Sequence, residues 1–242
     1  MSDKKVQIVL GIPGNWQDRG ALVEAIATQS DGYIMTGRLL MNSASKRVWE
    51  LDIEGRDPRL GRAFEIASRG RISNEDIQAI AAHRFACYLI ADGGSIPSAR
   101  LILDAACGLL RAGGLAVKVE SSGLAHSRDK WLSFSQTIGG RALYPVFVTL
   151  INGEKGAYSC GMHNLGFRDA ALDVQLPPDV ASKTLNTFLE YLIRENPKLS
   201  DGNTFSVDPK AQRFKIVLEP CRQYPSDDLM HNPYGVWRLS PA

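Results

Sequence analysis

The chain has little of what usually assigns a protein to a functional class. None of its apolar runs approaches the roughly 20 residues that cross a bilayer, so no membrane span is predicted. The apolar stretch that follows the start is too short for a signal peptide. The 28 Lys and Arg nearly balance the 26 Asp and Glu, which gives no general attraction for nucleic acid.

Cysteine is also scarce. The four cysteines are widely spaced, and two of them lie in apolar runs, as small core residues do. This pattern does not indicate a disulfide scaffold. We therefore expect a soluble, reduced, cytoplasmic protein.

Nucleotide-binding signatures are missing from the segment where they would be expected. A strand at residues 6–10 is followed by Gly11, Gly14 and Gly20, a spacing that fits neither the Walker loop nor the dinucleotide fingerprint. The segment predicts a turn at Pro13-Gly14, with Trp16 packed under it and Asp18 as the cap of a helix. An anion held by the free N–H groups of that helix is the alternative.

What the sequence does contain is a regular succession of strands and helices. The first half predicts strands at 6–10, 32–42, 46–53 and 85–91, and helices at 18–29, 59–68 and 73–84. This β-α-β-β-α-β order is typical of a ferredoxin-like unit. After it come a helix at 95–110, a strand at 115–119 and a helical patch around residue 131.

The remainder is predicted to add more strands and one long helix. Apolar runs at 142–151 and 157–162 indicate a hairpin, 170–176 a strand, and 179–195 a helix capped by Asp179 and ended by Asn196-Pro197. RFKIVLEP and YGVWRLSP indicate two final strands. We predict an α/β (α+β) protein with a mixed sheet and packed helices, in two halves (1–122 and 123–242) that form one globular unit.

One candidate anion site lies between a strand and a helix, in ADGGSIPSAR. Backbone N–H groups of Gly94 and Ser95, with Gly93 flexible beside them and Arg100 one turn on, could hold a phosphate or carboxylate. Asp92 would lie at the end of the strand, where ligands of open α/β sheets usually bind. The alternative is a well-formed helix start, with Ser95 as its cap.

Two other constellations suggest chemistry. Ser122 and His126 follow a strand and could lie close together, although a triad needs a third residue that orients the base, and a polar turn is the alternative. Cys160-x-x-His163 has the spacing of metal ligands, to which Cys221 and His231 could add. The second pair is too loosely spaced for a structural zinc site, and we predict neither metal nor cofactor.

The most basic stretch is GRDPRLGRAFEIASRGR. Its members Arg59, Arg62 and Arg69 could grip carboxylates or phosphates and so form a docking surface for an acidic partner. A solvated helix face is the alternative. Phe64 is the only aromatic residue there, so nucleic acid is not favoured.

Several segments resemble a known family. A Tyr-x-x-Gly-Met turn formed by Tyr158, Gly161 and Met162 leads through Gly166 to Asp173, and a late Asp-Gly-x-Thr begins at Asp201. With VQIVLGIPGNW and HRFACYLIADGG, these motifs are similar to the bacterial domain of unknown function family 4261. The resemblance implies a bacterial cytoplasmic α/β domain and transfers no catalytic residue. Independently, the glycines of GMHNLG suit a tight turn with positive φ, and its Met162 and Leu165 suit a core.

The functional hypothesis rests mainly on the lack of a convincing catalytic constellation. It is a non-enzymatic bacterial interaction protein, of the inhibitor, immunity or accessory type, with a protein partner. The alternative is a ligand-binding or hydrolytic enzyme with its site near Asp92–Ser95 and Ser122–His126.

Overall fold

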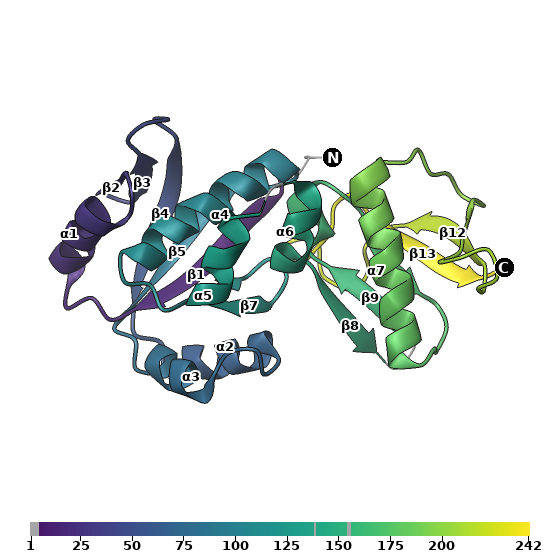
Figure 1. Ribbon diagram of the computed structural model, residues 1–242, viewed down its shortest axis with the longest axis horizontal. Coiled ribbons are helices and arrows are strands. Elements are labelled where there is room, and N and C mark those ends of the chain that lie inside the picture. Colours follow the sequence, from purple (N-terminus) through teal and green to yellow (C-terminus); the bar gives the residue numbers. More distant parts are fainter. Residues whose placement is uncertain (1–4, 138, 154–155) are drawn as a thin grey trace.

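The computed structural model describes residues 5–137, 139–153 and 156–242, which form two sheets arranged along the long axis of the molecule (Figure 1). The N-terminal elements build the sheet at the purple and blue end, and the C-terminal elements build the one at the yellow end. A single cluster of buried apolar side chains runs from Ile8 in the first sheet to Leu239 in the second. The two sheets therefore share one core.

The first sheet has seven strands. In chain order they are β1 (Gln7–Gly14), β2 (Tyr33–Thr36), β3 (Leu39–Asn42), β4 (Val48–Gly55), β5 (Phe85–Asp92), β6 (Ala116–Val119) and β7 (Leu124–Ser127). Their order in space is β2-β3-β4-β5-β1-β6-β7, and every neighbouring pair is antiparallel. The alternate residues Ile8, Leu10 and Ile12 of the central strand β1 are fully buried, as period-two patterning requires.

Five helices cover this sheet unequally. They are α1 (Arg19–Gln29), α2 (Leu60–Ser68), α3 (Asn74–Ala81), α4 (Ile96–Arg111) and α5 (Arg128–Ser135). α1, α4 and α5 pack on one face and bury the main core. α2 and α3 lie together below them in Figure 1 and form a separate small cluster with Ala86, Ala116 and Ala125. The predicted caps Asp18, Ser73 and Ser95 are confirmed, because each side chain accepts a hydrogen bond from the first helical turn.

The second sheet has six strands and is mixed. It contains β8 (Thr149–Gly153), β9 (Gly156–Cys160), β10 (Asp169–Leu172), β11 (Thr204–Phe205), β12 (Phe214–Glu219) and β13 (Val236–Pro241), in the order β11-β12-β13-β10-β9-β8. β10 and β13 are parallel and the other pairs antiparallel. α7 (Pro178–Glu195) packs on it through the predicted stripe, which is confirmed as buried. The hairpin β8–β9 is also confirmed, and residues 154–155 of its loop lie outside the described residues.

The α/β class is confirmed, whereas the strand order differs from that of a ferredoxin-like unit. In a split β-α-β unit, a strand lies between the two strands that a helix joins. Here α2 and α3 join β4 to β5, which are direct neighbours. Two successive helices return the chain in the opposite direction, so β5 comes back antiparallel beside β4. The division at residue 122 stays a prediction, and the next elements, β7 and α5, lie with the first sheet.

Four local expectations were wrong. Residues 32–42 form the hairpin β2–β3, because Gly37 takes φ 57° between them. β1 runs on through Gly14, so the predicted turn residues Pro13 and Gly14 belong to the strand, although Trp16 is buried as predicted. The first part of the apolar run 142–151 is the helix α6 (Gly140–Phe147). The cap of α7 is Pro177, and Asp179 lies inside the first turn.

Candidate functional site

The turn of GMHNLG connects β9 to β10 of the second sheet and contacts the first half of the chain through Asn164, whose carbonyl accepts the N–H of Gly94 and whose Oδ1 accepts Ser121 Oγ. The turn is the 3₁₀ helix η1 (Met162–Leu165), and Gly161 and Gly166 flank it with φ of 113° and 88°, as predicted. Met162 and Leu165 are buried in the core, which is also confirmed. A side chain at Gly161 would collide with the carbonyl oxygen of Phe147, so glycine is required both by the φ angle and by the close approach.

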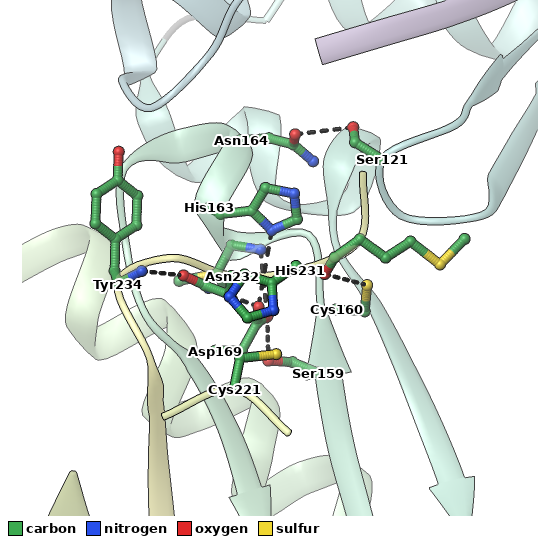
Figure 2. Close-up of polar contacts among 12 residues, drawn as sticks. Ser121, Ser159, Cys160, His163, Asn164, Asp169, Cys221, His231, Asn232 and Tyr234 are labelled. Atoms are coloured by element: carbon green, nitrogen blue, oxygen red, sulfur yellow. Dashed lines mark hydrogen bonds and ion pairs between the residues drawn. The ribbon is translucent and has the colours of Figure 1, made fainter. Parts of the chain in front are cut away.

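A buried polar network anchors this turn to the loop between β12 and β13, which carries Asn232 (Figure 2). Its centre is the carboxylate of Asp169, which accepts hydrogen bonds from Ser159 Oγ at 2.7 Å, Asn232 Nδ2 at 2.6 Å and the N–H of Met162 at 3.3 Å. Asn232 Nδ2 also donates to the carbonyl of Phe167 at 3.1 Å. We call Ser159, Asp169, Asn232 and His163 the Asp169 network.

His163 completes the network without being accessible to a substrate. Its Nδ1 lies 3.9 Å from Asp169 Oδ2, and its Nε2 lies 3.1 Å from the carbonyl oxygen of Leu229. The side chain is 1 % exposed. Nε2 is held by a backbone carbonyl, whereas Nδ1 is buried without a hydrogen-bond partner among the described residues, so the ring is closed off from a substrate. The network is structural.

The structure brings the four candidate metal ligands into one region, as Figure 2 shows: Cys160, His163, Cys221 and His231. The ring nitrogens of His163 and His231 nevertheless face the backbone carbonyls of Leu229 and Tyr224. Burial raises the pKa of the Cys160 thiol well above its usual range, which disfavours the thiolate that a metal needs. Within the described parts of the chain, no group of three His, Cys, Asp or Glu is arranged to hold a metal ion.

The predicted anion site is occupied by the protein's own contacts. The N–H of Gly94 donates to the carbonyl of Asn164 at 3.2 Å, and that of Gly93 donates to Val6. Ser95 Oγ caps α4 and bonds to Ser98. Asp92 pairs with Lys5 at the surface. These residues form the junction between β5, α4 and η1.

Arg100 points away from that junction. Its guanidinium donates to the carbonyl oxygens of Phe134, Ser135 and Thr137 at the end of α5, and to Asp104 at 3.2 Å. These carbonyls lie in and just beyond the last turn of α5, so Arg100 caps the C-terminal end of this helix. Anion binding by residues 92–100 stays a prediction that these contacts do not favour.

Ser122 and His126 are both buried, at 3 % and 5 % exposure. His126 Nε2 lies 3.0 Å from the carbonyl oxygen of Val146, and its ring packs against Trp131 and Phe134. Burial lowers the pKa of His126 to about 4. A neutral imidazole sealed among aromatic rings is a core residue, and neither side chain is open to a substrate.

The three arginines are exposed, yet each already has an internal partner. Arg59 forms a bidentate pair with Asp57, and Arg62 contacts Glu65 at 2.6 Å. Arg69 donates to the carbonyl of Leu150 at 2.7 Å and ends α2 in the left-handed conformation. A docking role for this stretch stays a prediction.

The feature that sequence reasoning missed is an uncovered face of the first sheet. Ile34, Met41 and Val48 lie directly opposite one another on β2, β3 and β4, so their side chains share a face. Their neighbours in sequence, such as Leu40 and Trp49, are buried on the other face. The register continues this face through Leu39, Ile90 and Val9.

We call these six side chains the open face: Val9, Ile34, Leu39, Met41, Val48 and Ile90. α2 and α3 cover only the far end of this side of the sheet, where Ala86, Ala116 and Ala125 lie. Ile34, Leu39 and Val48 are 39 %, 42 % and 50 % exposed. Several apolar side chains gathered on one surface are typical of an interaction site, whereas scattered ones are not.

Residues 158–240 match the model of a family described as a domain of unknown function (DUF4261). The resemblance to DUF4261 is confirmed for the C-terminal part of the chain. The match covers η1, the Asp169 network and the Asp-Gly-x-Thr turn, and it leaves out the first sheet. No curated protein and no solved structure matches the chain significantly.

The DUF4261 motifs have structural explanations. Asp201 accepts the N–H of Leu218 at 2.8 Å, and Gly202 takes φ 86° in the turn before β11. Asp173 pairs with Arg238 on the neighbouring strand. In the ranges that the structure describes, no helix is both long and apolar enough to cross a membrane.

Proposed function

We propose that this chain is a non-enzymatic interaction protein that binds another protein through the open face of its first sheet. The observation that supports the proposal is the exposure of Ile34, Leu39 and Val48 on one face of neighbouring strands whose opposite face packs against the core. A solvated face of an antiparallel sheet normally carries polar residues at these positions. An inhibitor, immunity-type or accessory role in a bacterial cell is the form of this function that the sequence favours.

The size of the surface suits a protein partner. Burying one exposed aliphatic side chain completely is worth about 1.5–3 kcal/mol. The open face spans β2, β3, β4, β5 and β1, and five strands at about 4.8 Å spacing measure about 19 Å across. Such a patch can form the apolar centre of an interface that has a polar rim.

The enzyme alternative has less support. Its two central residues, Ser122 and His126, are buried, and His126 is directed at a backbone carbonyl. General-base catalysis needs the base within hydrogen-bond reach of a substrate proton. Opening the core would be necessary before either residue could meet a substrate.

A capture experiment with a matched control tests the proposal. We would compare the native chain with the double variant Ile34→Glu/Val48→Glu and with the control Val180→Glu/Leu218→Glu, which alters equally exposed apolar residues elsewhere. We expect the native chain and the control to retain a protein from the lysate of the source cells, and the open-face variant to lose it. If all three folded proteins retain the same set, the proposal is wrong.

A further inference from the structure

Acidic side chains lie within and around the open face. Five carboxylates lie on the same side of the sheet, since the register places each of them on that face: Glu50, Asp52, Glu54, Asp92 and Glu120. Three of them have a cation of their own, in the pairs Arg38–Asp52, Lys5–Asp92 and Lys118–Glu120. Together these five carboxylates and three cations carry a net charge of −2, although the whole chain carries +2.

Of the two remaining carboxylates, Glu50 stands beside the exposed apolar side chains, whereas Glu54 lies opposite Ala86, toward the end of the sheet that α2 and α3 cover. Glu50 lies directly between Leu39 and Ile90 in the register, and Glu54 lies further along β4. Both side chains are exposed, and no ion pair of either is found in the described ranges. The carboxylate of Asp52 and, at longer range, Glu50 and Glu54 raise the pKa of Arg38. The surface therefore combines an apolar centre with negative charge that the chain itself does not balance.

This charge selects between possible occupants. A second copy docked through the same surface would bring the two sets of carboxylates together, and like charges at an interface are strongly unfavourable. An acidic partner meets the same repulsion. A partner that offers apolar side chains with Lys or Arg beside them buries the apolar centre and pairs with Glu50 and Glu54.

We infer that the open face binds a protein segment that is apolar on one side and carries basic residues next to its apolar side chains. The inference rests on the proposed function and adds the chemistry of the partner. It is the reverse of the acidic partner expected from the arginine stretch. The apolar contacts supply most of the affinity, and the carboxylates select the partner and speed its association.

The test uses two synthetic 14-residue amphipathic peptides. Both carry leucine on one face, and the other face carries lysine in the first and glutamate in the second. Fluorescence anisotropy measures their binding to the full chain at low salt. We expect the lysine peptide to bind and the glutamate peptide to bind at least about tenfold more weakly.

Charge variants connect this preference to the open face. Glu50→Lys/Glu54→Lys should weaken the lysine peptide about tenfold at low salt, and the difference should shrink as salt rises, because exposed charges are screened over about 10 Å at 0.1 M. The control Glu24→Lys/Asp227→Lys changes the net charge equally at exposed residues elsewhere and should bind like the native chain. Val48→Ser should weaken the lysine peptide, and Val180→Ser should not.

Three results would overturn the inference. They are equal binding of both peptides, equal loss in the two charge variants, and concentration-dependent self-association that Val48→Ser abolishes. If the cellular capture succeeds while the peptides do not discriminate, the interaction function stands and only the basic partner is wrong. If the lysine peptide binds as expected while no cellular protein is captured, the surface chemistry stands and the proposed function loses its support.

Discussion

The Asp169 network and the open face differ in nearly every physical respect. The network is polar, buried and matched by the DUF4261 family. The open face is apolar, exposed or half-buried, and outside the matched residues. Recognisable motifs in this chain mark positions where the backbone needs glycine or where a buried carboxylate holds a loop. The surface best suited to binding has no motif, because any set of apolar side chains at the right register can form it.

The largest difference between the two regions should appear in stability. Asp169→Ala leaves the donors of Ser159, Asn232 and Met162 without their acceptor inside the core. We expect a loss of about 3–5 kcal/mol in the free energy of unfolding, measured by urea denaturation. The exposed Glu50→Ala should change it by less than about 0.5 kcal/mol. Similar losses for Asp169→Ala and Glu50→Ala would show that the Asp169 network stabilises the fold no more than the open face does.

The apolar residues of α7 allow the same comparison within one helix. Leu189 is fully buried at the centre of the apolar stripe, whereas Val180 is 43 % exposed. Leu189→Ala should cost about 2–5 kcal/mol, because it leaves a cavity in the core. Val180→Ala should cost far less. An unchanged denaturation midpoint and slope for Leu189→Ala would show that this face of α7 is not core.

The lowered pKa of His126 predicts how the free energy of unfolding depends on pH. Its pKa is about 4 in the folded state and about 6.5 in the unfolded chain, because burial disfavours the imidazolium. The unfolded state therefore binds the proton more readily. The contribution of His126 to the free energy of unfolding is full above pH 6.5. It falls by about 3 kcal/mol in total as the pH drops toward 4.

His126→Leu should remove that part of the pH dependence. Denaturation curves from pH 7 to pH 4 would therefore be flatter for the variant than for the native chain. An identical slope in both would mean that His126 is accessible to solvent, and the enzyme alternative would regain weight.

The smallest effect is expected at the arginine stretch. Replacing Arg59, Arg62 and Arg69 together by Ser removes exposed pairs that are each worth well under about 1 kcal/mol. Folding should be nearly unchanged, and binding of the lysine peptide should not fall. Weakened binding to an acidic partner at low salt would instead restore this stretch as a docking surface.

The sequence predicted those elements best whose signals agreed with each other. The helix α4 has a serine cap, proline in its first turn and a regular apolar stripe, and the expected residues form it. The aromatic and β-branched residues of α6 favour a strand, and Pro145 disfavours the interior of a helix, so the sequence predicts the wrong element here. Leu143, Val146 and Phe147 nevertheless have helical spacing, which was the signal that could have identified it.

The binding surface could not be predicted in the same way. Strands such as LLMN and the start of VWELDIEG have apolar residues on both faces, which normally indicates burial on both sides. Only the three-dimensional arrangement reveals that α2 and α3 cover one end of that side and leave the rest uncovered. The Asp169 network could not be predicted either, because Asn232 is 63 residues from Asp169 in the sequence and no motif spacing connects them.

Photo-crosslinking in the source cells tests the central claim most directly. A photoreactive amino acid at position 48 places the probe in the open face, and one at position 28 places it on an exposed helical site away from that face. We predict a discrete adduct with one protein from position 48, lost on adding Ile34→Glu, and none from position 28. Equal adducts from both positions, or none from position 48 while the protein is folded, would contradict the account.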